Sequence, residues 1–162
     1  METITRVSYL MDVTVVTLTA KAAQREFITK YFESLSENDV NVDMISQSAP
    51  MDRSVRVSFT ADDAEVAGVL KTTSAMRNIC QDLRTEMNSQ NVKLTFFGEK
   101  MSDTPGVAAK VLRFFLDNET EPVLITTSLF SITCIINSHD FMRIRPALTS
   151  VFGELTDKFV QA

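Results

Sequence analysis

One loop in the sequence has the residue types of an anion-binding site. The stretch GEKMSDTPGVAAKVL (residues 98–112) places a polar loop and a Pro-Gly step directly before an amphipathic run. Asp103 or Thr104 would cap a helix, and Pro105 would suit its first turn, where a missing N–H group costs nothing. The N–H groups that follow, beginning at Gly106, would then lie at the positive end of the helix dipole and bind a carboxylate. A plain strand-to-helix connection is the alternative.

The other reactive side chains form no catalytic or metal-binding pattern. Cys80 and Cys134 have no CxxC or Cys/His neighbourhood, so we expect buried free thiols of a reducing compartment rather than a zinc site. His139 is the single histidine, and no nucleophile or base accompanies it in the polar turn NSHD. The acidic loop at 117–121 is explained by solvation more simply than by a cation. We therefore expect no enzyme activity, no metal and no cofactor.

Composition narrows the class of protein further. The chain has 162 residues, of which 44% are hydrophobic and 23% charged, as expected for one medium globular domain or two small ones. Its net charge of -5 argues against nucleic acid, whose binding requires clustered Lys and Arg. There is no apolar run of about 20 residues and no signal-peptide centre. A cytoplasmic protein without membrane contact is expected.

The hydrophobic periodicity predicts the order strand, helix, strand, strand, helix, strand, followed by a second copy that stops one strand short. In the first copy we expect strands at Val13–Leu18, Val40–Ser46, Ser54–Thr60 and Ile79–Met87, with helices at Ala22–Leu35 and after a cap at Asp62 or Asp63. In the second we expect strands at Val92–Phe97, Val123–Thr127 and Phe130–Ile136, with helices at Pro105–Leu116 and from Phe141 to Leu155. Pro146 predicts a kink in the last helix or a later start.

A sheet that lacks one strand leaves backbone groups unpaired, and the remaining segment, Ile4–Tyr9, can supply that strand. We therefore expect residues 13–88 to form one unit, inserted into a second unit made of residues 1–12 and 89–162. The predicted fold class is α+β, with two ferredoxin-like βαββαβ units whose antiparallel sheets carry helices on one face. Several strands are apolar on both faces, which favours packing between units or chains and a homodimer.

Three stretches carry a resemblance to a known family. The phrases NVDMISQS (41–48) and GEKMSDTPGVAAKV (98–111) and the ending FSITCIINSHDFMRIRPALTSVFGEL (130–155) resemble the paired ACT domains that form the regulatory part of aspartokinases. The resemblance covers nearly the whole chain. It implies the inserted topology predicted above and an allosteric amino-acid sensor without a kinase domain, either a separate regulatory subunit or part of a longer kinase. In similar aspartokinases lysine or threonine binds between ACT units of a dimer and inhibits the kinase.

The resemblance also implies an effector site in the first unit. Asp43 would pair with the effector ammonium while backbone N–H groups at the helix start take its carboxylate; a solvated strand-end carboxylate is the simpler alternative. The implied effector-binding residues are Lys21, Gln24, Phe27, Ile28, Val42, Asp43 and Ser48. The corresponding second-unit loop comprises Met101, Ser102, Asp103, Thr104, Gly106 and Val107.

This sequence departs from the family pattern in both units. The first loop, TAKAAQ, lacks Pro-Gly, which favours lysine over threonine, and Glu121 replaces the usual Asn before the strand. The implied partners are the amino acid, a second copy of the chain and an aspartokinase catalytic domain or subunit. The alternative function is an ACT-type association module that holds catalytic subunits together without binding an effector.

Overall fold

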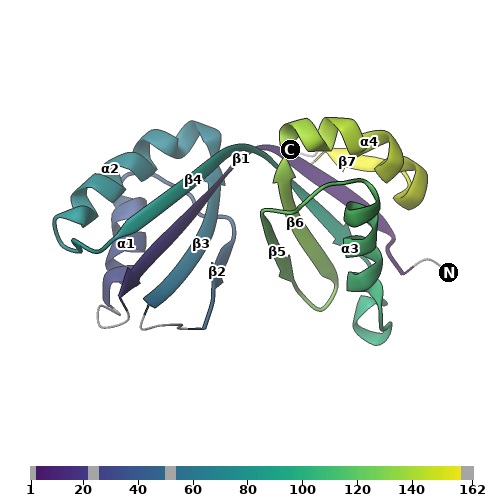
Figure 1. The fold of residues 1–162 in the computed structure, drawn as a ribbon, viewed down its shortest axis with the longest axis horizontal. Coiled ribbons are helices and arrows are strands. Elements are labelled where there is room, and N and C mark those ends of the chain that lie inside the picture. Colours follow the sequence, from purple (N-terminus) through teal and green to yellow (C-terminus); the bar gives the residue numbers. More distant parts are fainter. Residues whose placement is uncertain (1–2, 22–25, 50–53, 158–162) are drawn as a thin grey trace. The chain divides into compact units, whose positions relative to one another are not determined.

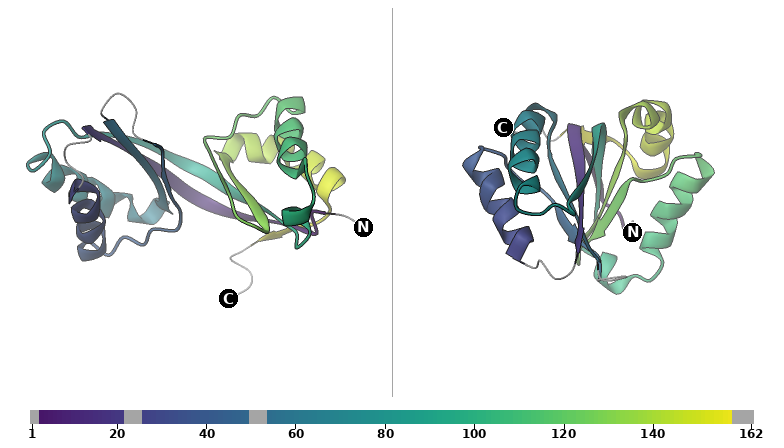
Figure 2. Two further views of the ribbon diagram at one scale, coloured as in Figure 1. Left: turned by 90° about the horizontal axis from the view of Figure 1, so that it is seen from below. Right: turned by 60° about the vertical axis from the view of Figure 1, so that its left-hand side comes forward.

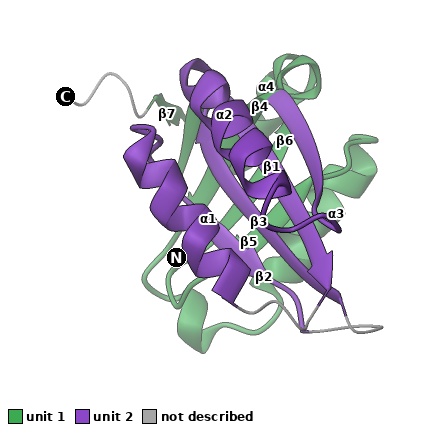
Figure 3. Ribbon diagram, turned by 90° about the vertical axis from the view of Figure 1, so that its left-hand side faces the viewer, with its two compact units in different colours: residues 1–11, 90–162 green, residues 12–89 purple. Residues whose placement is uncertain are grey.

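Two strands organise the chain. The computed structural model describes residues 3–21, 26–49 and 54–157 (Figure 1). Contacts divide the chain into unit 1, residues 1–11 and 90–162, and unit 2, residues 12–89 (Figure 3). Strands β1 (Arg6–Lys21) and β4 (Arg84–Phe97) are neighbours, and both pass from one unit into the other (Figure 2).

The continuity of these strands corrects the sequence prediction. Ile4–Tyr9 and Val13–Leu18 were expected as two strands, and so were Ile79–Met87 and Val92–Phe97. Each pair is largely one continuous strand. The junction residues Asp12 (φ 57°) and Gln90 (φ 60°) change the backbone direction only locally, and no glycine or proline marks either junction. Both lie where the chain crosses between units. The predicted start of the strand Ile79–Met87 was wrong as well, because the residues after Ile79 form a turn up to β4.

Unit 2 is an antiparallel sheet covered on one face by two helices, as Figure 1 shows. The strand order is β2-β3-β1-β4, so β2 lies at the edge. Phe27, Tyr31 and Leu35 recur at helical spacing and are buried against the sheet. The Tyr31 hydroxyl shares a 2.7 Å hydrogen bond with Thr73 of the second helix, and burial raises the pKa of Tyr31. Besides β1 and β4, the elements of this unit are α1 (Glu26–Glu37), β2 (Ile45–Gln47), β3 (Ser54–Asp62), the short 3-10 helix η1 (Asp63–Glu65) and α2 (Val66–Arg77).

Unit 1 repeats this arrangement. Its sheet follows the order β1-β4-β6-β5, with β7 parallel to the start of β1. Alternate residues of β4 and β6, such as Leu94 and Cys134, are buried with apolar residues of both helices. Burial raises the pKa of the Cys134 thiol to about 12, and both cysteines are buried thiols. The further elements are η2 (Met101–Asp103), α3 (Val107–Asp117), β5 (Leu124–Thr127), β6 (Ser131–Asn137), α4 (Ser138–Phe152) and β7 (Leu155–Asp157).

The predicted α+β class with two ferredoxin-like units is confirmed, whereas several boundaries are corrected. The strand expected at Val40–Ser46 begins only at Ile45. Leu155 was assigned to the last helix but belongs to β7, because Gly153 (φ 85°) ends the helix first. Pro146 lies inside α4, so the later start was wrong. Asp62 caps η1 by accepting the Ala64 N–H (2.8 Å). No helix among the described residues is long and apolar enough to cross a membrane.

Candidate functional site

The predicted effector residues of unit 2 differ in how accessible they are. Phe27 is 5% exposed, so it belongs to the core and cannot contact a ligand without rearrangement. Ile28 and Val42 are half-buried and pack against the same core. Gln24 lies outside the described residues. The accessible members are Lys21, Asp43 and Ser48.

These three residues do not meet within one chain. Asp43 donates its N–H to the carbonyl of Thr60 (3.0 Å), and Ser48 donates its N–H to the carbonyl of Arg56 (3.2 Å). Strand β1 pairs Val15 with Thr60 and Lys21 with Ser54, so Asp43 and Lys21 are separated by six strand residues. At about 3.3 Å per residue that is about 20 Å. Ser48, near the level of Thr19, belongs to the Lys21 end.

Lys21 already has an acidic partner. Its Nζ lies 2.9 Å from Oδ2 of Asp82, with 69% of the lysine side chain and 47% of the aspartate side chain exposed. Asp82 occupies the turn between α2 and β4. The sequence offered no signal for this pair, because its members are far apart along the chain and the resemblance pointed to Lys21 but not to Asp82.

The second-unit loop adopts a different cap from the predicted one. The N-cap of α3 is Gly106 (φ 90°), with no side-chain hydrogen bond, and Pro105 precedes the helix. Thr104 is not the cap, because its hydroxyl donates to the carbonyl of Lys100 (2.7 Å) and closes the loop. Asp103 ends η2. The first N–H groups of α3 therefore have no side-chain cap, which leaves the helix end suited to an anion.

A cavity of about 140 Å³ lies at this helix end. Its lining includes Thr104, Gly106 and Val107, together with Thr3 and Ile4, and Lys110 lies on the next helical turn. Met101 faces inward and packs against the unit 1 core, whereas Ser102 is exposed. With the uncapped helix end and Lys110, this cavity forms an electropositive niche.

Gly98, at the start of the same loop, allows the N-terminus to approach. A Cβ at this position would lie 1.7 Å from the carbonyl oxygen of Thr3. The Gly98 N–H donates to the Phe130 carbonyl (2.9 Å), and Thr5 donates its N–H to the Phe97 carbonyl (2.8 Å). Only glycine fits this contact between the chain start and the end of β4.

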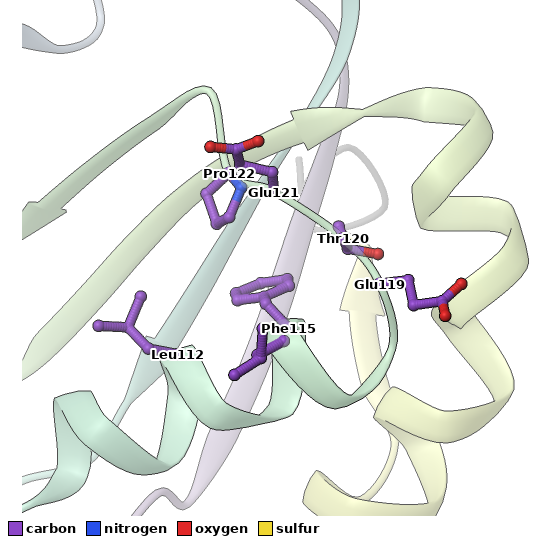
Figure 4. Close-up of a pocket in the computed structure, with 7 residues that line it drawn as sticks. Leu112, Phe115, Glu119, Thr120, Glu121 and Pro122 are labelled. Carbon is purple, nitrogen blue, oxygen red and sulfur yellow. The ribbon is translucent and has the colours of Figure 1, made fainter.

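A larger, apolar groove of about 410 Å³ runs beside α3 (Figure 4). Leu112 and Phe115 project from the helix toward Pro122, and the Glu121 carboxylate lies beside the proline. Leu116 is 65% exposed. Such a surface can accept apolar side chains from another chain.

Arg143 fixes the loop that borders this groove. Its guanidinium donates to the carbonyls of Asn118 (2.7 Å) and Glu119 (3.1 Å), the Thr120 hydroxyl (3.0 Å) and the Asp140 carboxylate (2.9 Å). The two carbonyls lie just beyond the C-terminal end of α3, where a cation is favourable. The sequence did not single out Arg143, since its partners belong to a different segment of the chain.

Among the described residues, no group of three or more His, Cys, Asp or Glu side chains is placed to hold a metal ion. His139 lies in the first turn of α4, and its backbone N–H donates to Oδ1 of the Asn137 side chain (2.9 Å). Asn137 is thereby the cap of that helix.

Comparison with known proteins finds a matching family model and similar folds. Residues 94–152 match the model of an ACT domain family. The regulatory subunit of aspartate kinase from Thermus thermophilus, solved ligand-free, superposes with a TM-score of 0.81 at 22% identity, covering 93% of this chain and 99% of that one. The fold is that of an aspartokinase regulatory region. This chain therefore shares its fold with a whole regulatory subunit.

The chain also resembles parts of longer aspartokinases. An aspartokinase from Bacillus sp. (strain MGA3) is 23% identical over 156 residues, 96% of this chain and 38% of the relative. E. coli aspartokinase III, solved in complex with lysine and aspartate, matches with a TM-score of 0.69 at 19% identity, over 94% of this chain and 34% of that one. The chain spans well under half the length of these two relatives.

Proposed function

We propose that this regulatory region is an amino-acid sensor that binds lysine in preference to threonine and controls an aspartokinase catalytic domain or subunit in aspartate-family biosynthesis. Its two compact units are the proposed ACT-type units, one inserted into the other. The observation that carries the proposal is the separation of accessible charged residues along the β2 edge. Asp43 lies at one end of this edge and Ser48 at the other, and Lys21, two strands further in on β1, lies at the Ser48 end of the sheet.

A second copy of the chain would unite these residues. Strand β2 pairs with β3 on one side and is the outer strand of unit 2, so its other side offers backbone groups for a further strand. A two-fold axis near Ser46 would pair β2 with the partner's β2 in antiparallel orientation. Asp43 of one protomer would then approach the partner's Ser48. The exposed Ile45 side chain (59%) gives this edge an apolar contact.

The resulting crevice would complement a free amino acid. The Asp43 carboxylate supplies a partner for an ammonium group, and Lys21 from the other protomer supplies a partner for the carboxylate. Two such crevices arise in a symmetric dimer. A ligand that binds this dimer arrangement better than the alternative would shift the kinase equilibrium by its differential affinity, typically about 1–3 kcal/mol.

Lysine is preferred for two reasons. The first loop lacks the Pro-Gly step, as lysine-type loops do, and the similar E. coli aspartokinase III was solved with lysine.

We assign effector binding to unit 2 and not to the second-unit loop. Ser128 in unit 1 corresponds to Ser48, and the residue five positions before it is Val123 instead of an aspartate. The electropositive niche at Gly106 would therefore meet the carboxylate of an amino acid without an acidic group to take its ammonium.

The apolar groove beside α3 favours a second function, association without sensing. Leu112 and Leu116 are 45% and 65% exposed, which suits contact with another chain. In this case the two-unit region would hold catalytic subunits together, and no amino acid would bind.

Isothermal titration and thermal unfolding with lysine, threonine and methionine discriminate between the two functions. We expect lysine to bind with one site per chain and to stabilise the protein by about 2.7 kcal/mol at 100 times its Kd. Light scattering should give a dimer, twice the 18.1 kDa chain mass. Absence of heat and of any thermal shift with all three amino acids would refute sensing and leave association.

A further inference from the structure

We propose that Asp82 is an intramolecular competitor for the effector carboxylate and thereby sets the amino-acid concentration at which this region responds. The inference rests on the proposed function, because it concerns the Lys21 end of the same site. The observation that points to it is the 2.9 Å ion pair between Lys21 and Asp82.

Both members of the pair are held in place by the fold. Lys21 is the last residue of β1, where it pairs with Ser54, and it follows the buried Ala20. Asp82 lies in a two-residue turn between Cys80 and Leu83, which are 1% and 5% exposed. The Leu83 N–H donates to the Cys80 carbonyl (3.1 Å) and closes this turn. The carboxylate is therefore presented to Lys21 from an anchored backbone.

An effector carboxylate that approaches Lys21 meets the Asp82 carboxylate at the same ammonium. It must either displace Asp82 or share the three N–H donors of Lys21 with it. Displacement costs the ion pair, and sharing brings two like charges together. Both routes lower affinity, so removal of the Asp82 charge should raise it.

The size of the effect follows from the exposure of the pair. Exposed ion pairs contribute little, because water screens them, and their measured strength corresponds to an equilibrium ratio of about two to five. Asp82 would therefore tune the response concentration by this factor and would not act as an on/off switch.

The test is titration of lysine into the Asp82→Asn variant of the full chain. We expect Kd to fall about two- to fivefold, the ratio that an exposed ion pair can account for. The matched control is Asp117→Asn, which removes an equally charged side chain whose partner is Arg113 in unit 1. Its Kd should equal that of the wild type.

A second background shows whether Asp82 acts through Lys21. In Lys21→Met the ammonium is gone, so adding Asp82→Asn should leave the weakened Kd unchanged. An unchanged or higher Kd for the single variant Asp82→Asn would overturn the competitor role while leaving the sensor intact. If the wild type binds none of the three amino acids, the proposed function itself fails, and this inference fails with it.

Discussion

Replacing Asp43 by alanine should weaken lysine binding by about 30-fold or more, because a charge-assisted contact is lost and the ligand ammonium remains without an acceptor. Asp43 is exposed at the end of the β2 edge, and its backbone is fixed by the hydrogen bond from its N–H to Thr60. The substitution should therefore leave the fold unchanged. Isothermal titration measures the loss, and the thermal midpoint without ligand verifies folding.

Two further variants separate charge from shape at this position. Asp43→Asn keeps the size of the side chain and should lose most of the affinity, since the ammonium requires a charge. Glu33→Ala removes an exposed acidic residue on α1 of the same unit and should bind like the wild type. If Asp43→Ala binds lysine normally, Asp43 is a solvated carboxylate at a strand end.

The largest effect on stability is expected for Gly98→Ala. Its Cβ would lie 1.7 Å from the Thr3 carbonyl oxygen, a backbone atom that cannot rotate away. The chain start would have to shift, although Ile4 is buried in the unit 1 core. Such forced packing costs about 1–3 kcal/mol, and we expect a value in the upper half of this range.

Urea unfolding measures this cost, with Glu99→Ala as the control. Glu99 is the exposed neighbour, so its truncation should change the free energy of unfolding by about 0.5 kcal/mol at most. Equal stability of Gly98→Ala and the wild type would mean that the chain start does not pack against the end of β4.

Much of the fold could be predicted from periodicity. Phe27, Tyr31 and Leu35 repeat at the helical period, and alternate residues in the second half of β4, from Val92 to Phe96, enter the core. The joining of strands could not be predicted, because Asp12 and Gln90 adopt positive φ without glycine. Strand ends depend on pairing with distant segments, which local sequence does not encode.

The site was predictable only in part. The phrase NVDMISQS pointed to Asp43 and Ser48 through resemblance, but no local signal shows that these residues lie at opposite ends of an edge strand. The cap at Gly106 was missed because the Thr104 hydroxyl bonds to its own loop instead of the helix. Lys21 and Asp82 are joined by folding alone.

The central claim is that each effector crevice takes Asp43 from one protomer and Lys21 from the other. Subunit complementation tests it most directly. Asp43→Ala and Lys21→Glu chains are unfolded together, refolded as a mixture and titrated with lysine, alongside each variant alone. In a mixed dimer one crevice combines both substitutions and the other retains both native residues. The account predicts that the mixture regains about a quarter of the wild-type sites at near-native affinity, although each variant alone binds lysine only weakly. A mixture that binds no better than its separate components would contradict it.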